Sequence, residues 1–399
     1  MNERANESPA ALTRTNRDVW RRLRTGEISA LPITAVLLLI WLVFQSLNSA
    51  FLSSDNLVNL MQQSAATGVI ALGAVLTLHL GQIDLSVGAV SGLAAAIVAV
   101  GSVRWGWPMI VAVLVALAAG VLVGLLYGAV HTRLGVPSFV FTLAGLLVVG
   151  GLQLRVLGDT GSVNLPFESW LVRFCQTSFI PAAVSWLIVA VVVLFFALVK
   201  LRDRARRLAA ELSAPSLASV LGATLLLAAV LAGAVAYLGT NRGVGSVFAL
   251  FVGLVVLTDV ALRRMRWGRY VRAVGGDLQA ARRAGVPVRR VLITVFVAGS
   301  TLAALGGVLA AGRLAAANQA SGAVDVTLTA VAAAVIGGTS MYGGRGSAWS
   351  ALLGILIIQS ISTGLTLLNQ DQSVRFVVTG LVLGIAVLID ALQRRARQE

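Results

Sequence analysis

The sequence predicts an all-α fold, a polytopic membrane bundle of about twelve transmembrane helices. Of the 399 residues, 58% are hydrophobic and only 12% are charged, which leaves too little polar surface to cover a water-soluble protein of this size. The mean hydropathy is correspondingly high, at +0.90. The apolar residues also gather into runs of about 20, the length at which a helix crosses a bilayer.

The apolar runs follow one another along the chain with polar connections between them. In order they cover residues 31–47, 62–80, 85–101, 108–130, 138–157, 180–199, 217–238, 246–262, 291–311, 326–336, 348–368 and 376–392. The tenth run is short and ends at Gly337-Gly338, so it could cross the membrane or form a re-entrant or broken helix. We therefore expect one transmembrane domain over residues 31–392, with a basic tail at 1–30 and a short tail at 393–399.

The charge distribution predicts the orientation. The formal net charge is +15, from 31 basic and 16 acidic residues, but the arginines lie at the ends of apolar runs and are not interleaved with aromatic residues. This pattern favours membrane topology over nucleic-acid binding as the reason for the charge. If the N-terminus is cytoplasmic, an even number of spans places the arginine-rich segments 200–207 and 263–290 and the C-terminal tail in the cytoplasm as well.

Residues 267–290 are the longest internal polar interruption of the apolar sequence. Asp277, a typical N-cap residue, follows the pair Gly275 and Gly276, and the stop signals Gly285 and Pro287 close the segment. Between them, a helix of about two turns is predicted, which is too short to be stable alone in water. Its small residues Ala280 and Ala281, with Ala284, would let a docking partner approach closely beside Arg282. The alternative is a solvated loop whose arginines only fix topology.

Two further polar turns stand beside apolar sequence. In the first, Asp84, Ser86 and Gly88 follow the second span, where Asp84 either caps the third helix or forms a functional polar site. The second, at residues 335–347, contains the glycine pairs Gly337-Gly338 and Gly343-Gly344, which favour a compact cytoplasmic turn. It is not a phosphate-binding P-loop, because the chain contains no Gly-Lys-Ser/Thr and its one lysine is Lys200.

The remaining polar residues predict no catalytic chemistry. The single cysteine, Cys175, cannot form an internal disulfide, and the isolated His79 and His131 lack metal-ligand spacing. We therefore expect no enzyme activity, no cofactor and no metal site. Four polar residues within the spans could line a pathway, although hydroxyl groups there also satisfy helix carbonyls. They are Gln62, Gln63, Thr67 and Thr142.

Taken together, the motifs resemble the sugar permeases of ABC importers, in the branch of ribose, galactose and xylose systems that is related to branched-chain amino-acid permeases. IDLSVG at 83–88, AVGGDLQAARRAGV at 273–286 and VIGGTSMYGGRGS at 335–347 are similar to that family's motifs in matching order, and VPSFVFTLAG at 136–145 also resembles it. Asp277 departs from the pattern, since the family usually has Asn there. Further departures are Arg283, where an apolar residue is common, and Met341-Tyr342, which replace smaller residues.

The resemblance implies a permease in the bacterial inner membrane. Its expected partners are two cytoplasmic ABC ATPase subunits, which would contact the coupling loop at 263–290, a periplasmic sugar-binding protein and a second permease copy. The substrate would be a monosaccharide, and the pair of spans over 180–238, similar to those of xylose-type members, favours xylose. The alternative function is an ion-coupled secondary transporter. The spans hold few acidic residues for ion coupling, since Asp259 and Asp325 lie near span ends.

Overall fold

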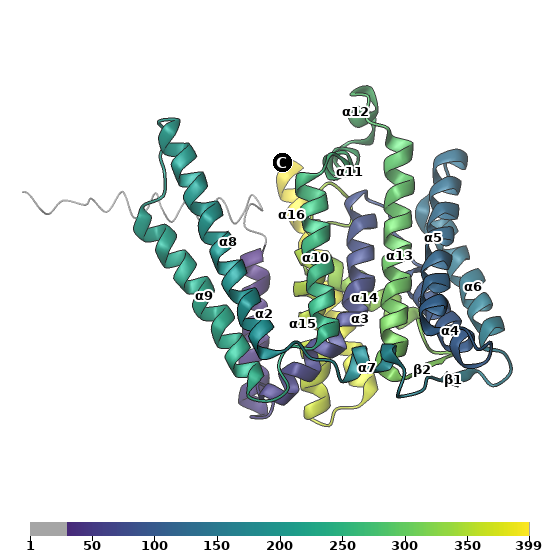
Figure 1. The fold of residues 1–399 in the computed structure, drawn as a ribbon. Coiled ribbons are helices and arrows are strands. Elements are labelled where there is room, and N and C mark those ends of the chain that lie inside the picture. The colour runs from purple at the N-terminus through teal and green to yellow at the C-terminus, as the bar shows by residue number, and fades with distance from the viewer. Residues whose placement is uncertain (1–29, 399) are drawn as a thin grey trace, which may run out of the picture.

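The computed structural model describes residues 30–398 and confirms the all-α membrane fold (Figure 1). Each of the twelve apolar runs forms a helix. Within the described residues, eight helices are long and apolar enough to span a membrane, while α2, α4, α14 and α16 contain shorter apolar stretches. The basic tail expected at 1–30 lies, apart from Ala30, outside the described residues. The helices of the apolar runs are α2 (Ala30–Leu47), α3 (Ser54–His79), α4 (Val87–Val103), α5 (Met109–Leu134), α6 (Ser138–Leu157), α8 (Ala182–Ala209), α9 (Leu217–Gly239), α10 (Ser246–Arg264), α13 (Val288–Leu314), α14 (Val324–Ile336), α15 (Trp349–Leu367) and α16 (Gln372–Gln398).

Several helix boundaries differ from the sequence expectation. Helix α3 begins eight residues before the expected start, where the Ser53 hydroxyl accepts a hydrogen bond from the Asn56 amide. Helix α8 continues beyond the expected end of its apolar run at residue 199, through the arginine-rich segment 200–207. Helix α16 likewise extends to Gln398, so the short tail expected from 393 is helical. Polar residues end an apolar run without ending a helix, since arginine and lysine are good helix formers.

Three short helices and a small sheet connect the long helices. They are α7 (Trp170–Gln176), α11 (Arg266–Gly276), α12 (Leu278–Arg283), and the antiparallel strands β1 (Ser162–Asn164) and β2 (Ala316–Asn318). Val163 pairs with Ala317, and both are buried against Ala96 of α4 and Leu157 of α6. The sheet therefore ties the connection after α6 to the connection after α13, at the end of the bundle opposite α12 (Figure 1).

The centre of the bundle is α13, which packs against α3, α4 and α5. Glycines make this packing close. A Cβ atom at Gly124 of α5 would lie 2.5 Å from Val297 Cα, and one at Gly307 of α13 would lie 1.9 Å from the Ser91 carbonyl oxygen of α4. The helices thus touch backbone to backbone, as small residues allow in membrane proteins.

Helices α8 and α9 form a hairpin that leans away from the bundle (Figure 1), and α9 contacts α3. Apart from Ser185, Val220 and Leu238, every residue of the two helices is at least partly exposed, as expected for helices surrounded by lipid. The base of the hairpin is tied together, because Ile180 N–H donates to the Val244 carbonyl at 2.9 Å and Ser246 N–H donates to the Ser178 carbonyl at 3.0 Å. Arg242 adds an ion pair to Asp55 of α3 at 2.7 Å.

We predict that the thiol of Cys175 is unreactive in the folded protein. Cys175 lies on α7, fully buried against Gly312, and burial raises the pKa of its thiol to about 12. At pH 8, about one such thiol in ten thousand is ionised, and the thiolate is the reactive form. Mass spectrometry should therefore detect maleimide addition only after denaturation. Rapid addition to the native protein would contradict this burial.

Candidate coupling surface and polar pathway

The structure confirms the short helix predicted after the glycine pair. Asp277 is the N-cap of α12, and its Oδ1 accepts hydrogen bonds from the Gln279 and Ala280 amides at 2.8 and 2.9 Å. Gly285 follows the helix with φ +77°, a left-handed conformation that favours glycine. Its amide donates to the Arg282 carbonyl, so both ends of this six-residue helix are capped by its own chain.

The orientation of α12 corrects one expectation. Ala281 is only 5% exposed and packs into the protein's own cluster of apolar side chains, which includes Val271, Val288 and Val291. It therefore does not face a docking partner. Ala280 and Ala284 are exposed on the outer surface, together with Arg282 and Arg283. The prediction of small residues open to a partner thus applies to two of the three alanines.

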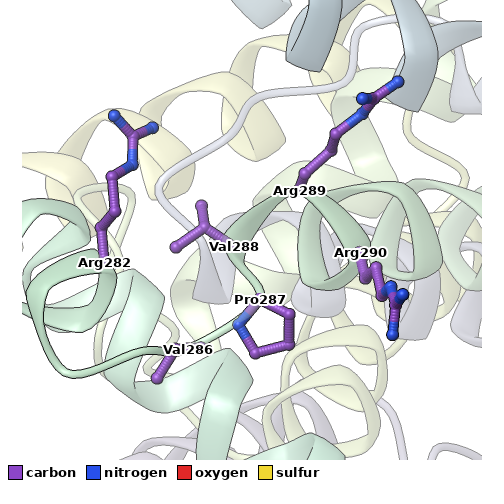
Figure 2. A pocket seen from close by; sticks show the side chains of 6 residues that line it. All are labelled: Arg282, Val286, Pro287, Val288, Arg289 and Arg290. Atoms are coloured by element: carbon purple, nitrogen blue, oxygen red, sulfur yellow. The ribbon is translucent and has the colours of Figure 1, made fainter.

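A cavity of about 530 Å³ lies beside α12, at the start of α13 (Figure 2). Three arginines and three apolar residues line it: Arg282, Arg289 and Arg290, with Val286, Pro287 and Val288. The ion pairs among residues 30–398 involve Arg207, Arg242 and Arg263, so the three arginines at the cavity have no acidic partner in this part of the chain. The cavity is thus lined by both apolar and positively charged side chains, and it lies at the same end of the bundle as α12 (Figures 1 and 2).

Two segments singled out in the sequence meet at the end of α3. The backbone carbonyl of His79 accepts a hydrogen bond from the Gly344 amide at 3.0 Å, and a Cβ at Gly275 would lie 1.8 Å from the same oxygen. Gly343 has φ +86°, and a Cβ atom there would lie 2.8 Å from both the Gly81 amide nitrogen and the Gly275 carbonyl oxygen. His79 itself is buried, with Nδ1 2.7 Å from the Val75 carbonyl, so it is a packed histidine. The glycine-rich turn and the segment before α12 therefore both pack on the C-terminal end of α3.

The other glycine pair, Gly337 and Gly338, ends α14. A Cβ at Gly337 would lie 1.9 Å from the Ser350 carbonyl oxygen, so this glycine allows α14 and α15 to touch. Gly338 has φ +95°, which lets the chain turn away from the helix.

Asp84 lies in a buried turn before α4. It is 2% exposed, and its Oδ1 accepts hydrogen bonds from the Ser86 amide at 2.8 Å and the Ser86 hydroxyl at 2.7 Å. The expected capping of the third span by Asp84 is not observed, because Asp84 accepts hydrogen bonds from Ser86, the N-cap residue, and from no first-turn amide of α4. The first-turn amide of Gly88 instead donates to the Thr327 hydroxyl of α14, at 3.0 Å. The turn therefore joins the starts of α4 and α14, the two shortest of the apolar helices.

The four candidate pathway residues separate into two groups. Thr142 is fully buried, and its hydroxyl bonds the Ser138 carbonyl and the Leu85 amide, which is a structural role. Gln62 is also buried, with Nε2 3.4 Å from the Gln176 carbonyl. By contrast, Gln63 and Thr67 are half-buried on one face of α3.

The structure adds two residues that sequence analysis missed. Gln359 of α15 donates a hydrogen bond from Nε2 to Gln63 Oε1 at 2.8 Å, and a longer one to the Thr363 hydroxyl at 3.3 Å. Gln359 is an amide inside a long apolar run, which was the signal available in the sequence. Its pairing with a residue almost 300 positions earlier required the fold.

The whole chain is similar to known transport proteins. Residues 56–387 match the family described as "Branched-chain amino acid transport system / permease component". The chain is 33% identical to the xylose transport system permease protein XylH of Escherichia coli K12, with 94% of each chain covered. It is 29% identical to the fructose import permease protein FrcC of Rhizobium meliloti, covering 92% of this chain and 86% of that one. It is also 29% identical to the ribose import permease protein RbsC of Bacillus subtilis, covering 90% and 91%. No solved structure matches.

We predict that Gly275→Ala destabilises the junction at His79, whereas Gly276→Ala does not. The added methyl group at 275 would collide with the His79 carbonyl, and overpacking of this kind costs about 1–3 kcal/mol. At Gly276 the methyl group meets nothing within 4 Å, so the change should stay within about 0.5 kcal/mol. Thermal unfolding of the purified variants would compare them. Equal stability of the two would show that the close approach at Gly275 is unimportant.

Proposed function

The chain belongs to the family of branched-chain amino acid transport system permease components, and from this premise we propose that it is the membrane-spanning permease subunit of an ATP-driven importer for a monosaccharide. The observation that carries the proposal is the similarity to sugar permeases over nearly the full length of both chains. The chain is a transport component rather than an ATPase, in keeping with the absence of Gly-Lys-Ser/Thr from its sequence.

The ATPase partner is proposed to bind at α12 and the adjacent arginine-lined cavity. Helix α12 is held by Asp277 and by the apolar cluster beneath it, so its outer surface is presented in a fixed orientation. Exposed Ala280 and Ala284 permit close contact. Arg282, Arg289 and Arg290 have no acidic partner among residues 30–398, which favours an acidic surface on the partner. Gly275 serves this surface by packing closely on His79, and Gly285 serves it by its left-handed turn after α12.

The cytoplasmic side is proposed to be the end that carries α12. The basic tip between α8 and α9, the α12 region and the C-terminus all lie at this end (Figure 1), which agrees with the positive-inside rule. Both termini would then be cytoplasmic. The β1–β2 sheet and α7 would face the periplasm, where a sugar-binding protein delivers the substrate.

Xylose is the proposed substrate, and two copies of the chain are proposed to form the pathway between them. The support for xylose is the 33% identity to a xylose permease, compared with 28–29% to the fructose and ribose permeases. The hairpin of α8 and α9 is the pair of additional spans that favoured a xylose-type member from the sequence.

We predict that Ala280→Trp abolishes ATP-driven uptake without destabilising the protein. The indole would stand on the exposed side of α12 and hold the ATPase away, while surface changes usually shift stability by less than about 0.5 kcal/mol. Uptake by vesicles and thermal unfolding of the same preparations would be measured together. Ala281→Trp is the matched comparison, since at this buried position it should lower stability by about 1–3 kcal/mol. Normal uptake by the Ala280 variant would show that α12 is not part of the surface that binds the ATPase.

We also predict the energy source and substrate preference in reconstituted vesicles. Uptake should require ATP, an ABC ATPase partner and a sugar-binding protein, and labelled xylose should accumulate faster than ribose or fructose. The chain alone should neither bind nor hydrolyse ATP, because it lacks the phosphate-binding loop. Uptake driven by an imposed ion gradient without ATP would instead support a secondary transporter.

A further inference from the structure

A stripe of polar side chains runs along the outer half of α3. Asn59, Gln63 and Thr67 are spaced by four residues, so they lie above one another on one face of the helix, and all three are partly exposed. At the end opposite α12, Asn59 accepts a hydrogen bond from Arg242 at 2.7 Å. Beyond Thr67 the stripe stops, because every residue from 68 to 79 is buried. The polar face therefore extends from one end of the helix to its middle.

The facing helix α15 completes this polar face. Gln359 donates to Gln63 across the two helices at 2.8 Å, and Gln359 and Thr363 are partly exposed, as Gln63 is. Gln359 and Thr67 each stand at the middle of their helix by residue count. Within the described chain the Thr67 hydroxyl makes no hydrogen bond and Gln359 Oε1 accepts none, so both groups remain able to bind another molecule.

Such a face does not suit contact with lipid. Amide and hydroxyl groups that are exposed halfway along a membrane-spanning helix lose their hydrogen bonds if hydrocarbon covers them. By comparison, the exposed residue at the middle of α5 is Leu122, as expected for a lipid-facing position. The polar face of α3 and α15 must therefore border water, a polar substrate or a second polar surface.

We propose that Gln63, Thr67, Gln359 and Thr363 form a sugar-hydroxyl binding site halfway across the membrane, a proposal that rests on the function proposed above. Carboxamides and hydroxyls both donate and accept hydrogen bonds, which suits the hydroxyl groups of a neutral polyol such as a monosaccharide. The site contains no charged side chain, so it favours uncharged sugars over phosphorylated ones.

The first test measures transport by the complete importer, with its ATPase and binding protein, in vesicles. Gln63→Leu and Gln359→Leu each replace a hydrogen-bonding carboxamide by an apolar side chain of similar size. Each variant therefore loses the hydrogen bonds that the carboxamide would make to the sugar. We expect xylose uptake to fall about tenfold or more in each, while ATPase activity stimulated by the binding protein persists. Gln62→Leu is the matched control, because it changes the same residue type one position away on a buried face. Unchanged uptake in the two variants, or an equal loss in the control, would show that Gln63 and Gln359 do not form a sugar-binding site. Absence of ATP-driven uptake by the unmodified protein would refute the proposed function instead.

The second test does not depend on transport and covers variants that fold poorly. Thr67→Cys should react with a charged, water-soluble thiol reagent in the complex embedded in lipid nanodiscs, because the proposed site is hydrated. Leu122→Cys, at the middle of lipid-facing α5, is the control and should stay unlabelled. Labelling of the unmodified protein gives the background reaction of buried Cys175. Failure of Thr67→Cys to react, as for Leu122→Cys, would refute a water-accessible site at this depth.

Discussion

The fold depends on backbone contact between helices that have no hydrophobic effect to bring them together. In a membrane, lipid chains are as apolar as leucine, so helices associate through dispersion contacts and hydrogen bonds. Gly124 and Gly307 supply such contact to α13, and at Gly354 of α15 a Cβ would lie only 1.8 Å from the Ala333 carbonyl oxygen of α14. These contacts hold the short helices α4 and α14 in the interior. Their irregular connections keep their polar backbone groups satisfied, as when Gln153 donates to the Asn318 and Ser321 carbonyls.

The same packing connects the surface at α12 to the helices of the polar face. Gly275 precedes α12, rests on the last residue of α3, His79, and neighbours Gly344, which leads toward α15. Helices α3 and α15 carry Gln63 and Gln359. The proposed ATPase surface at α12 and the two helices of the polar face therefore adjoin one another through backbone segments.

The sequence was informative where a local pattern determines structure. The apolar runs located the helices, and Asp277 with Gly285 located α12, because capping depends on neighbours only a few residues away. It was uninformative where distant segments meet. The inward direction of Ala281, the pairing of Val163 with Ala317 and the bond between Gln63 and Gln359 all depend on the three-dimensional packing. Gln62 and Gln63 were equivalent in sequence, and only the packing of α3 separates the buried one from the partly exposed one.

The tied base of the α8–α9 hairpin has a consequence for the evolution of the chain. Because the Ile180 amide and the Val244 carbonyl are in direct hydrogen-bond contact, the segment between them begins and ends at almost the same place. Few residues of that segment are buried, so a genetic insertion or deletion of the entire hairpin would leave the central helices in register. Since the hairpin contains two spans, its gain or loss would also leave the membrane orientation of every later helix unchanged. Relatives with and without it can thus share one inner architecture.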